Sequence, residues 1–112
     1  MNLEWIRAFC LALPGATEQV QWGNHLQLKV GGKMFAVTTF EPAEGTALSF
    51  KASPEDFAEL TERPGIIPAP YLARANWVAL ETFSGLRKAE YERLLRASYD
   101  LVVARLPKSK RP

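Results

Sequence analysis

The side chains most able to do chemistry in this sequence are one thiol and one imidazole. Cys10 and His25 are the only cysteine and the only histidine among the 112 residues. A nucleophilic Cys–His pair needs an accessible thiol, but Cys10 recurs with apolar residues at helical spacing, which favours a small buried side chain. His25 is predicted to be an ordinary surface residue of a strand. With no multi-cysteine or two-histidine cluster and no hydrolase, P-loop or dinucleotide motif, we expect no metal, no cofactor and no catalysis.

Positive charge offers a second kind of chemistry, and it is unevenly distributed. The formal net charge is only +2, yet residues 84–112 hold eight Lys or Arg against three Asp or Glu, and residues 1–83 carry a net −3. Phosphate binding depends on clustered charge more than on total charge. Four residues of the predicted last helix are therefore candidate nucleic-acid contacts: Arg87, Lys88, Arg93 and Arg96. The alternative is a solvated helix face followed by a disordered basic tail at 108–112.

The open face of a predicted sheet is the second candidate surface. Lys29 and Lys51 are expected on the solvent side of their strands, with Lys33 beside a turn at the rim. Arg74 lies in a proline-rich loop that would present its side chain with little further loss of entropy. Trp77 is expected on the same wet side, where an aromatic among basic residues suits stacking or groove insertion. The alternative for Trp77 is a packing role beneath a loop.

The first half of the chain predicts the elements that position these residues. Apolar residues at helical spacing predict a helix over residues 3–13, capped by Asn2 and stopped by Pro14-Gly15. Residues 14–24 show no sustained period and are predicted to form a loop. Alternating apolar residues over 25–30 and 33–40, on either side of Gly31-Gly32, predict a hairpin with a two-residue turn.

A register for this hairpin follows from placing Val30 opposite Lys33. Leu28 would then lie opposite Phe35 and Leu26 opposite Val37, so these residues would form the buried face of the sheet. The wet face would carry Met34, Ala36 and Thr38 together with His25, Gln27 and Lys29.

The second half of the chain begins with a predicted turn over 41–45, which is followed by a strand over 46–51 and a helix capped by Ser53 with Pro54 at its first position. Residues 64–75 form a pinned loop with room for a short strand. A strand over 76–83 and a helix over 87–106, ended by Pro107, complete the order α-β-β-β-α-β-α. This order predicts one α+β domain over residues 1–112, a two-layer sandwich with an antiparallel sheet of four or five strands packed on helices.

The sequence also indicates where the protein works. No apolar run approaches the roughly 20 residues needed to cross a bilayer. The first residues lack the basic segment of a signal peptide, since Glu4 precedes any Lys or Arg. A single cysteine fits a reducing compartment. We therefore predict a soluble, cytoplasmic protein with no membrane partner.

Short motifs along nearly the whole chain together resemble the MmcQ/YjbR family. They are Leu13-Pro14-Gly15, Trp22-Gly23, Gly32-Lys33-Met34-Phe35, Phe50-Lys51, Pro64-Gly65-Ile66, Pro68-Ala69-Pro70-Tyr71, Trp77-Val78 and Ser98-Tyr99-Asp100-Leu101-Val102. Their order and spacing, rather than any single motif, carry the resemblance. It implies a compact frataxin-like or secretion-chaperone-like fold and a role in DNA binding through a double-wing arrangement of hairpins. We therefore expect a non-catalytic DNA-binding protein that contacts the backbone; the alternative is a module that binds a protein partner or a small ligand.

Overall fold

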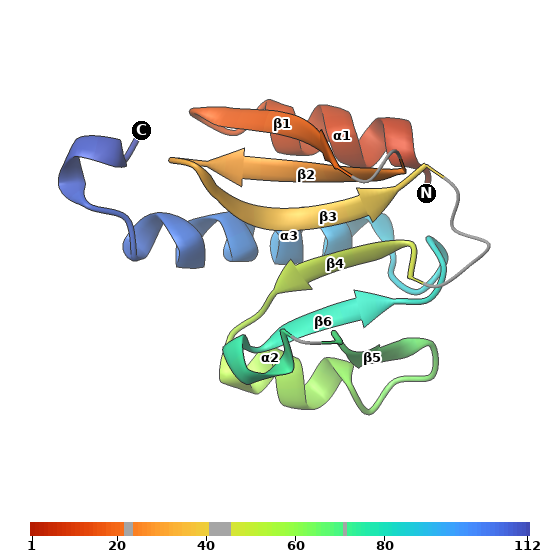
Figure 1. The fold of residues 1–112 in the computed structure, drawn as a ribbon. Coiled ribbons are helices and arrows are strands. Elements are labelled where there is room, and N and C mark those ends of the chain that lie inside the picture. Colours follow the sequence, from red (N-terminus) through yellow and green to blue (C-terminus); the bar gives the residue numbers. More distant parts are fainter. Residues whose placement is uncertain (22–23, 41–45, 71) are drawn as a thin grey trace.

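Three helices cover one face of a six-stranded antiparallel sheet in the computed structural model, which describes residues 1–21, 24–40, 46–70 and 72–112 (Figure 1). The sheet order is β1-β2-β3-β4-β6-β5. The helices are α1 (Leu3–Leu11), α2 (Pro54–Leu60) and α3 (Lys88–Ala104), and two short 3₁₀ turns are η2 (Ala73–Ala75) and η3 (Lys108–Lys110). The strands are β1 (Ala16–Gln21), β2 (His25–Val30), β3 (Lys33–Thr39), β4 (Leu48–Lys51), β5 (Ile66–Pro68) and β6 (Trp77–Leu80).

The predicted helices and their starts are confirmed. The side-chain oxygen of Asn2 accepts a hydrogen bond from Trp5 N at 2.8 Å, and Ser53 Oγ accepts one from Asp56 N at 3.1 Å. Each bond satisfies a backbone donor that has no partner within its helix. The apolar stripes of all three helices meet the sheet in one core, so the two-layer α+β architecture is also confirmed.

The predicted number and order of strands are wrong. The loop expected over residues 14–24 contains β1, the strand that was not predicted, and the order is α-β-β-β-β-α-β-β-α. β5, at the opposite edge, is the short strand for which residues 64–75 were predicted to have room. Among the described strands, β1 pairs with β2 alone, and its four central residues are all exposed. An edge strand that is open on both faces shows no alternation of apolar and polar residues, so the sequence pattern does not reveal it.

The predicted register of the central hairpin is wrong beyond its turn. Gly31 and Gly32 have φ of 58° and 82° and bring Val30 opposite Lys33, as the two-residue turn requires. A β-bulge then leaves Phe35 with no residue of β2 directly opposite it, and Leu28 lies opposite Ala36 instead.

The bulge sends the remaining residues of β3 to the opposite faces from those predicted. Ala36 and Thr38 are fully buried against the helices, whereas Val37 packs on the other face. Phe35 still enters the core, because the bulge lets two neighbouring residues point inward.

The sheet face away from the helices is partly covered. Trp77 is only 5% exposed and packs with Ala69 and Ala79 beneath the segment that leads through η2. The wet position expected for Trp77 is therefore wrong, and its alternative packing role is confirmed.

Among the described residues, no helix is long and apolar enough to span a membrane. The predicted turn over 41–45 and the motif residues Trp22, Gly23 and Tyr71 lie outside the described part of the chain.

Candidate nucleic-acid interface

Ser98 on α3 separates two strands that would otherwise stay paired. β3 and β4 pair from Thr38–Leu48 to Ala36–Phe50, and the next pair in this register would be Phe35 with Lys51. Instead, the Ser98 hydroxyl donates to Phe35 O at 2.6 Å and accepts from Lys51 N at 3.0 Å. The hydroxyl replaces a direct backbone bond of the ladder, so the strands diverge while both backbone groups stay satisfied.

A pocket of about 280 Å³ lies where β3 and β4 diverge. Its apolar walls come from β3, from β6 and from the end of α3, and three cations complete the lining: Lys33, Lys51 and Arg105. Lys51 is partly buried and donates from Nζ to Ala75 O at 3.0 Å. Burial lowers the pKa of Lys51, and the positive charge of Arg105 lowers it further. A pocket with this charge favours an anion over a cation.

The basic C-terminal tail is held beside this pocket. A Cβ at Gly31 would lie 2.5 Å from Leu106 Cδ1 and 3.0 Å from Lys110 O, so the tail packs on the glycine turn at a distance that only glycine permits. Arg111 donates to Leu106 O at 2.9 Å and to Ala104 O at 3.1 Å. These bonds satisfy carbonyls at the end of α3, where a positive charge also complements the helix dipole.

These contacts connect the cations of the open sheet face into one surface. Lys29 lies directly opposite Met34, which lines the pocket, and donates to Gln19 Oε1 at 2.5 Å. The Lys51–Ala75 bond brings β4 against the turn that carries Arg74. We call this surface the basic band and define it by Lys29, Lys33, Lys51, Arg74, Arg105, Lys108 and Lys110. Within the described chain, none of the seven forms an ion pair.

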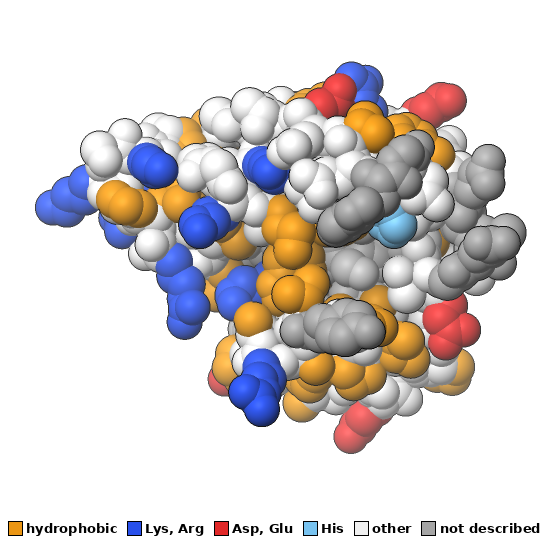
Figure 2. All heavy atoms as spheres, viewed as in Figure 1, with side chains coloured by type: hydrophobic (Ala, Val, Ile, Leu, Met, Phe, Trp, Pro, Cys, Tyr) orange, Lys and Arg blue, Asp and Glu red, His pale blue; other side chains and the backbone are white. Residues whose placement is uncertain are grey.

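Figure 2 shows the charge distribution on this face of the molecule. Lys and Arg side chains gather over the part that holds the β2–β3 turn and the C-terminal tail, and Asp and Glu lie mainly toward the opposite side and the lower margin. This face is therefore polarised, and its basic part lies on the side of the β2–β3 turn and the C-terminal tail, the segments that carry Lys33, Lys108 and Lys110.

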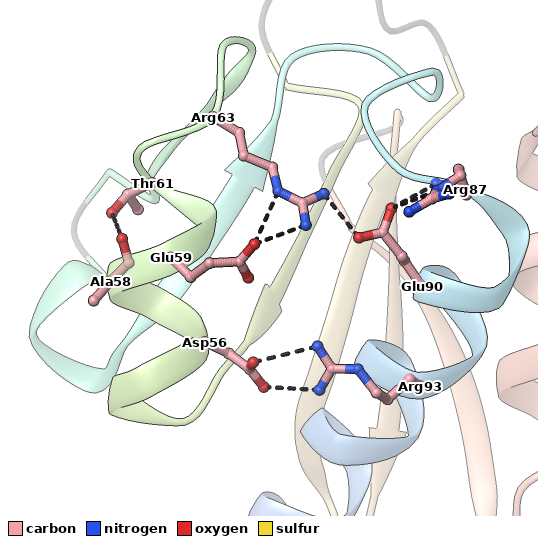
Figure 3. Close-up of polar contacts among 8 residues, drawn as sticks. All are labelled: Asp56, Ala58, Glu59, Thr61, Arg63, Arg87, Glu90 and Arg93. Carbon is pink, nitrogen blue, oxygen red and sulfur yellow. Dashed lines mark hydrogen bonds and ion pairs between the residues drawn. The ribbon is translucent and has the colours of Figure 1, made fainter.

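The arginines predicted on the last helix are not part of the band. Arg93 makes two bonds to Asp56 at 3.2 and 3.3 Å, which tie α3 to α2 (Figure 3). Arg96 pairs with Asp100 at 3.2 Å. Arg87 lies 3.7 Å from Glu90, which also binds Arg63 at 2.8 Å.

Carboxylates thus offset the charge of these three arginines. The arginines belong to the part of α3 that packs across the helix-covered face of the sheet, whereas the C-terminal end of α3 lines the pocket. Lys88 is exposed at the start of α3 and likewise lies apart from the band.

Two other motif residues have structural roles. Tyr99 packs its ring edge-on against Phe35, with centroids 5.4 Å apart, and donates its hydroxyl to Pro14 O at 2.5 Å. Pro68 ends β5 opposite Val78, on the outermost strand, where its missing N–H costs no ladder bond. Ser98 and Tyr99 thus both act on Phe35, whereas Pro68 lies at the far edge of the sheet.

Cys10 is fully buried among core residues, and this burial raises the pKa of its thiol to about 12. The predicted small buried role is confirmed, because a thiol so rarely ionised at neutral pH is a poor nucleophile. Within the described residues, no three His, Cys, Asp or Glu side chains gather as a metal site.

Arg105, Lys108 and Lys110 contributed to the C-terminal charge excess but were not singled out from the sequence. The available signal was the basic run after Pro107, since a chain that stops being helical there can fold back toward the glycine turn.

Comparison with known proteins agrees with this architecture. The family model described as YjbR matches residues 11–101. The uncharacterized protein YjbR of Escherichia coli K12 is 32% identical over 115 residues, covering 99% of this chain and 95% of that protein. The chain belongs to the YjbR family.

A solved structure shares this fold. The crystal structure of a protein from Pseudomonas syringae superposes with a TM-score of 0.73 at 21% identity, covering 90% of this chain and 98% of that one. The YjbR protein of Escherichia coli O157:H7 matches with the same identity and coverage as its K12 counterpart. The resemblance inferred from short motifs is thereby confirmed at the level of family.

Proposed function

We propose that this YjbR-family protein binds DNA through the phosphate backbone, along the basic band, and catalyses no reaction. One observation carries the proposal: seven cations on one side of the molecule form no ion pair with a described carboxylate, while Arg87, Arg93 and Arg96 on α3 each do. Unpaired, clustered cations supply the sequence-independent part of DNA affinity.

The buried position of Trp77 favours contact with the DNA backbone over stacking on the DNA bases. Trp77, the aromatic expected to stack, is 5% exposed and lies beneath residues of the η2 segment. Stacking requires an accessible ring face. We therefore expect similar affinities for unrelated sequences of equal length.

Fluorescence anisotropy of a labelled duplex, titrated at two salt concentrations, tests this proposal. If four of the seven band cations contact phosphates, the slope of log affinity against log salt should be about −3.6, which is a loss on the order of 100-fold between about 50 and about 200 mM. Lys33→Glu should weaken binding to every sequence alike. Lys88→Glu changes the net charge equally but lies off the band, so it serves as the matched control. No binding at low salt, or equal losses from both variants, would refute the proposal.

A further inference from the structure

The pocket between β3 and β4 has two chemically distinct parts. Lys33, Lys51 and Arg105 supply three cations. The rest of the lining is apolar and comes from Met34, Trp77, Val102, Leu106 and Pro107. No described carboxylate lines the pocket, so nothing there neutralises the cations.

The cations are placed where a bound anion would gain most. Lys51 is partly buried, and its ammonium group donates one hydrogen bond, to Ala75 O, among the described residues, which leaves further donors for a ligand. Arg105 and Lys33 are exposed, so they can move to close on a ligand. An anion bound between these positive groups would reduce their mutual repulsion, which no described carboxylate in the pocket lining does.

The apolar part would bind something other than an inorganic ion. Trp77, Val102 and Leu106 are each less than one-tenth exposed and belong to the packed body of the protein. The walls they form are therefore fixed before a ligand arrives. A volume of about 280 Å³ lies just below the range of about 300–1,000 Å³ that holds drug-sized molecules, which points to a small ligand.

We propose that this pocket binds a small amphipathic anion, with a carboxylate or phosphate head between Lys33, Lys51 and Arg105 and a short apolar body against Trp77, Val102 and Leu106. The site exists because Ser98 holds β3 and β4 apart. The proposal goes beyond DNA binding and does not depend on it, since a polymer on the band needs no apolar wall.

Titration of ¹⁵N-labelled protein by NMR tests the proposal with butyrate, hexanoate, hexyl phosphate, 1-hexanol and inorganic phosphate. The Lys51 amide and the Trp77 indole N–H should shift with hexanoate or hexyl phosphate. Each methylene that enters the pocket should tighten binding about fourfold, so hexanoate should bind more than tenfold tighter than butyrate. Hexyl phosphate has one methylene more in its chain than hexanoate, which accounts for about fourfold in affinity, so a difference beyond fourfold identifies carboxylate or phosphate as the preferred head.

The remaining probes decide whether both parts of the pocket act. Hexanol tests the apolar body alone and inorganic phosphate tests the charge alone, and both should bind at least tenfold more weakly than hexanoate or hexyl phosphate. Arg105→Gln should weaken hexanoate binding, whereas Lys88→Gln, the exposed control on α3, should not. Equal binding of phosphate and hexanoate, shifts outside the pocket, or no effect of Arg105→Gln would overturn the proposal. A protein that binds hexanoate but no duplex would refute DNA binding alone.

Discussion

Replacing Ser98 with Ala should reveal how much the separation of β3 from β4 depends on one hydroxyl. Ser98 is fully buried and holds Phe35 O and Lys51 N at 2.6 and 3.0 Å. The substitution leaves one backbone acceptor and one donor without this partner. An unsatisfied buried group costs about 1–3 kcal/mol, so the free energy of unfolding should fall by about 2–6 kcal/mol if the strands stay apart.

The fall in the free energy of unfolding should be smaller if β3 and β4 can pair directly in the Ser98→Ala protein. The register allows Lys51 N to bond Phe35 O directly once the hydroxyl is gone, which would restore one pair and narrow the pocket. Urea denaturation measures the free energy of unfolding, and amide hydrogen exchange at Lys51 separates the two outcomes. Slow exchange would indicate closure, and fast exchange would indicate an open, unsatisfied site.

Ser109→Ala is the matched control, because Ser109 is exposed in the tail and should change stability by less than about 0.5 kcal/mol. A Ser98→Ala protein as stable as this control, with unchanged exchange at Lys51, would refute the role assigned to the hydroxyl.

Single substitutions of Tyr99 and Arg93 and chemical labelling of Cys10 test three further features of the structure. Tyr99→Phe removes the hydroxyl bond to Pro14 O and should lower the free energy of unfolding by about 1 kcal/mol in urea; no change would mean that water replaces the bond without loss. Cys10, whose buried thiol has a pKa of about 12, should react with iodoacetamide only after unfolding, and rapid labelling of the folded protein would contradict its burial. Arg93→Gln breaks an exposed pair with Asp56 and should cost less than about 1 kcal/mol while leaving DNA affinity unchanged in the anisotropy titration; a marked loss of affinity would place α3 in the interface.

The predictable parts of the fold are those set by local chemistry. The Asn2 and Ser53 caps, the Gly31-Gly32 turn and the inward residues of β4 and β6 each follow from a side chain's own bonding capacity or from a two-residue period. These features depend little on distant segments, so one sequence suffices to predict them.

The missed parts depend on contacts between distant segments. The bulge at Phe35 is tied to Ser98, which lies 63 positions later in the chain and bonds the Phe35 carbonyl. No local pattern in 33–39 indicates that an extra residue must be accommodated there. β1 was missed for a related reason, since its only strand partner is β2 and no core face imposes alternation on it.

The residues of the candidate site also fall into a part that local patterns predict and a part that depends on distant contacts. Lys29, Lys33 and Lys51 were predicted on or beside the open face from alternation and turn position, and the structure brings them into one band with Arg74. The charge count treated the last helix as a single basic face. It could not show that Asp56, on another helix, offsets Arg93, because that pairing depends on how α2 and α3 pack.

Chemical-shift mapping with a short DNA duplex at low salt tests the central claim most directly. In ¹⁵N-labelled protein, the amides of Lys29, Lys33 and Lys51 should shift progressively as duplex is added, and those of Arg93 and Arg96 should stay in place. Shifts confined to α3, or no shifts at any duplex concentration, would contradict a DNA-binding surface on the basic band.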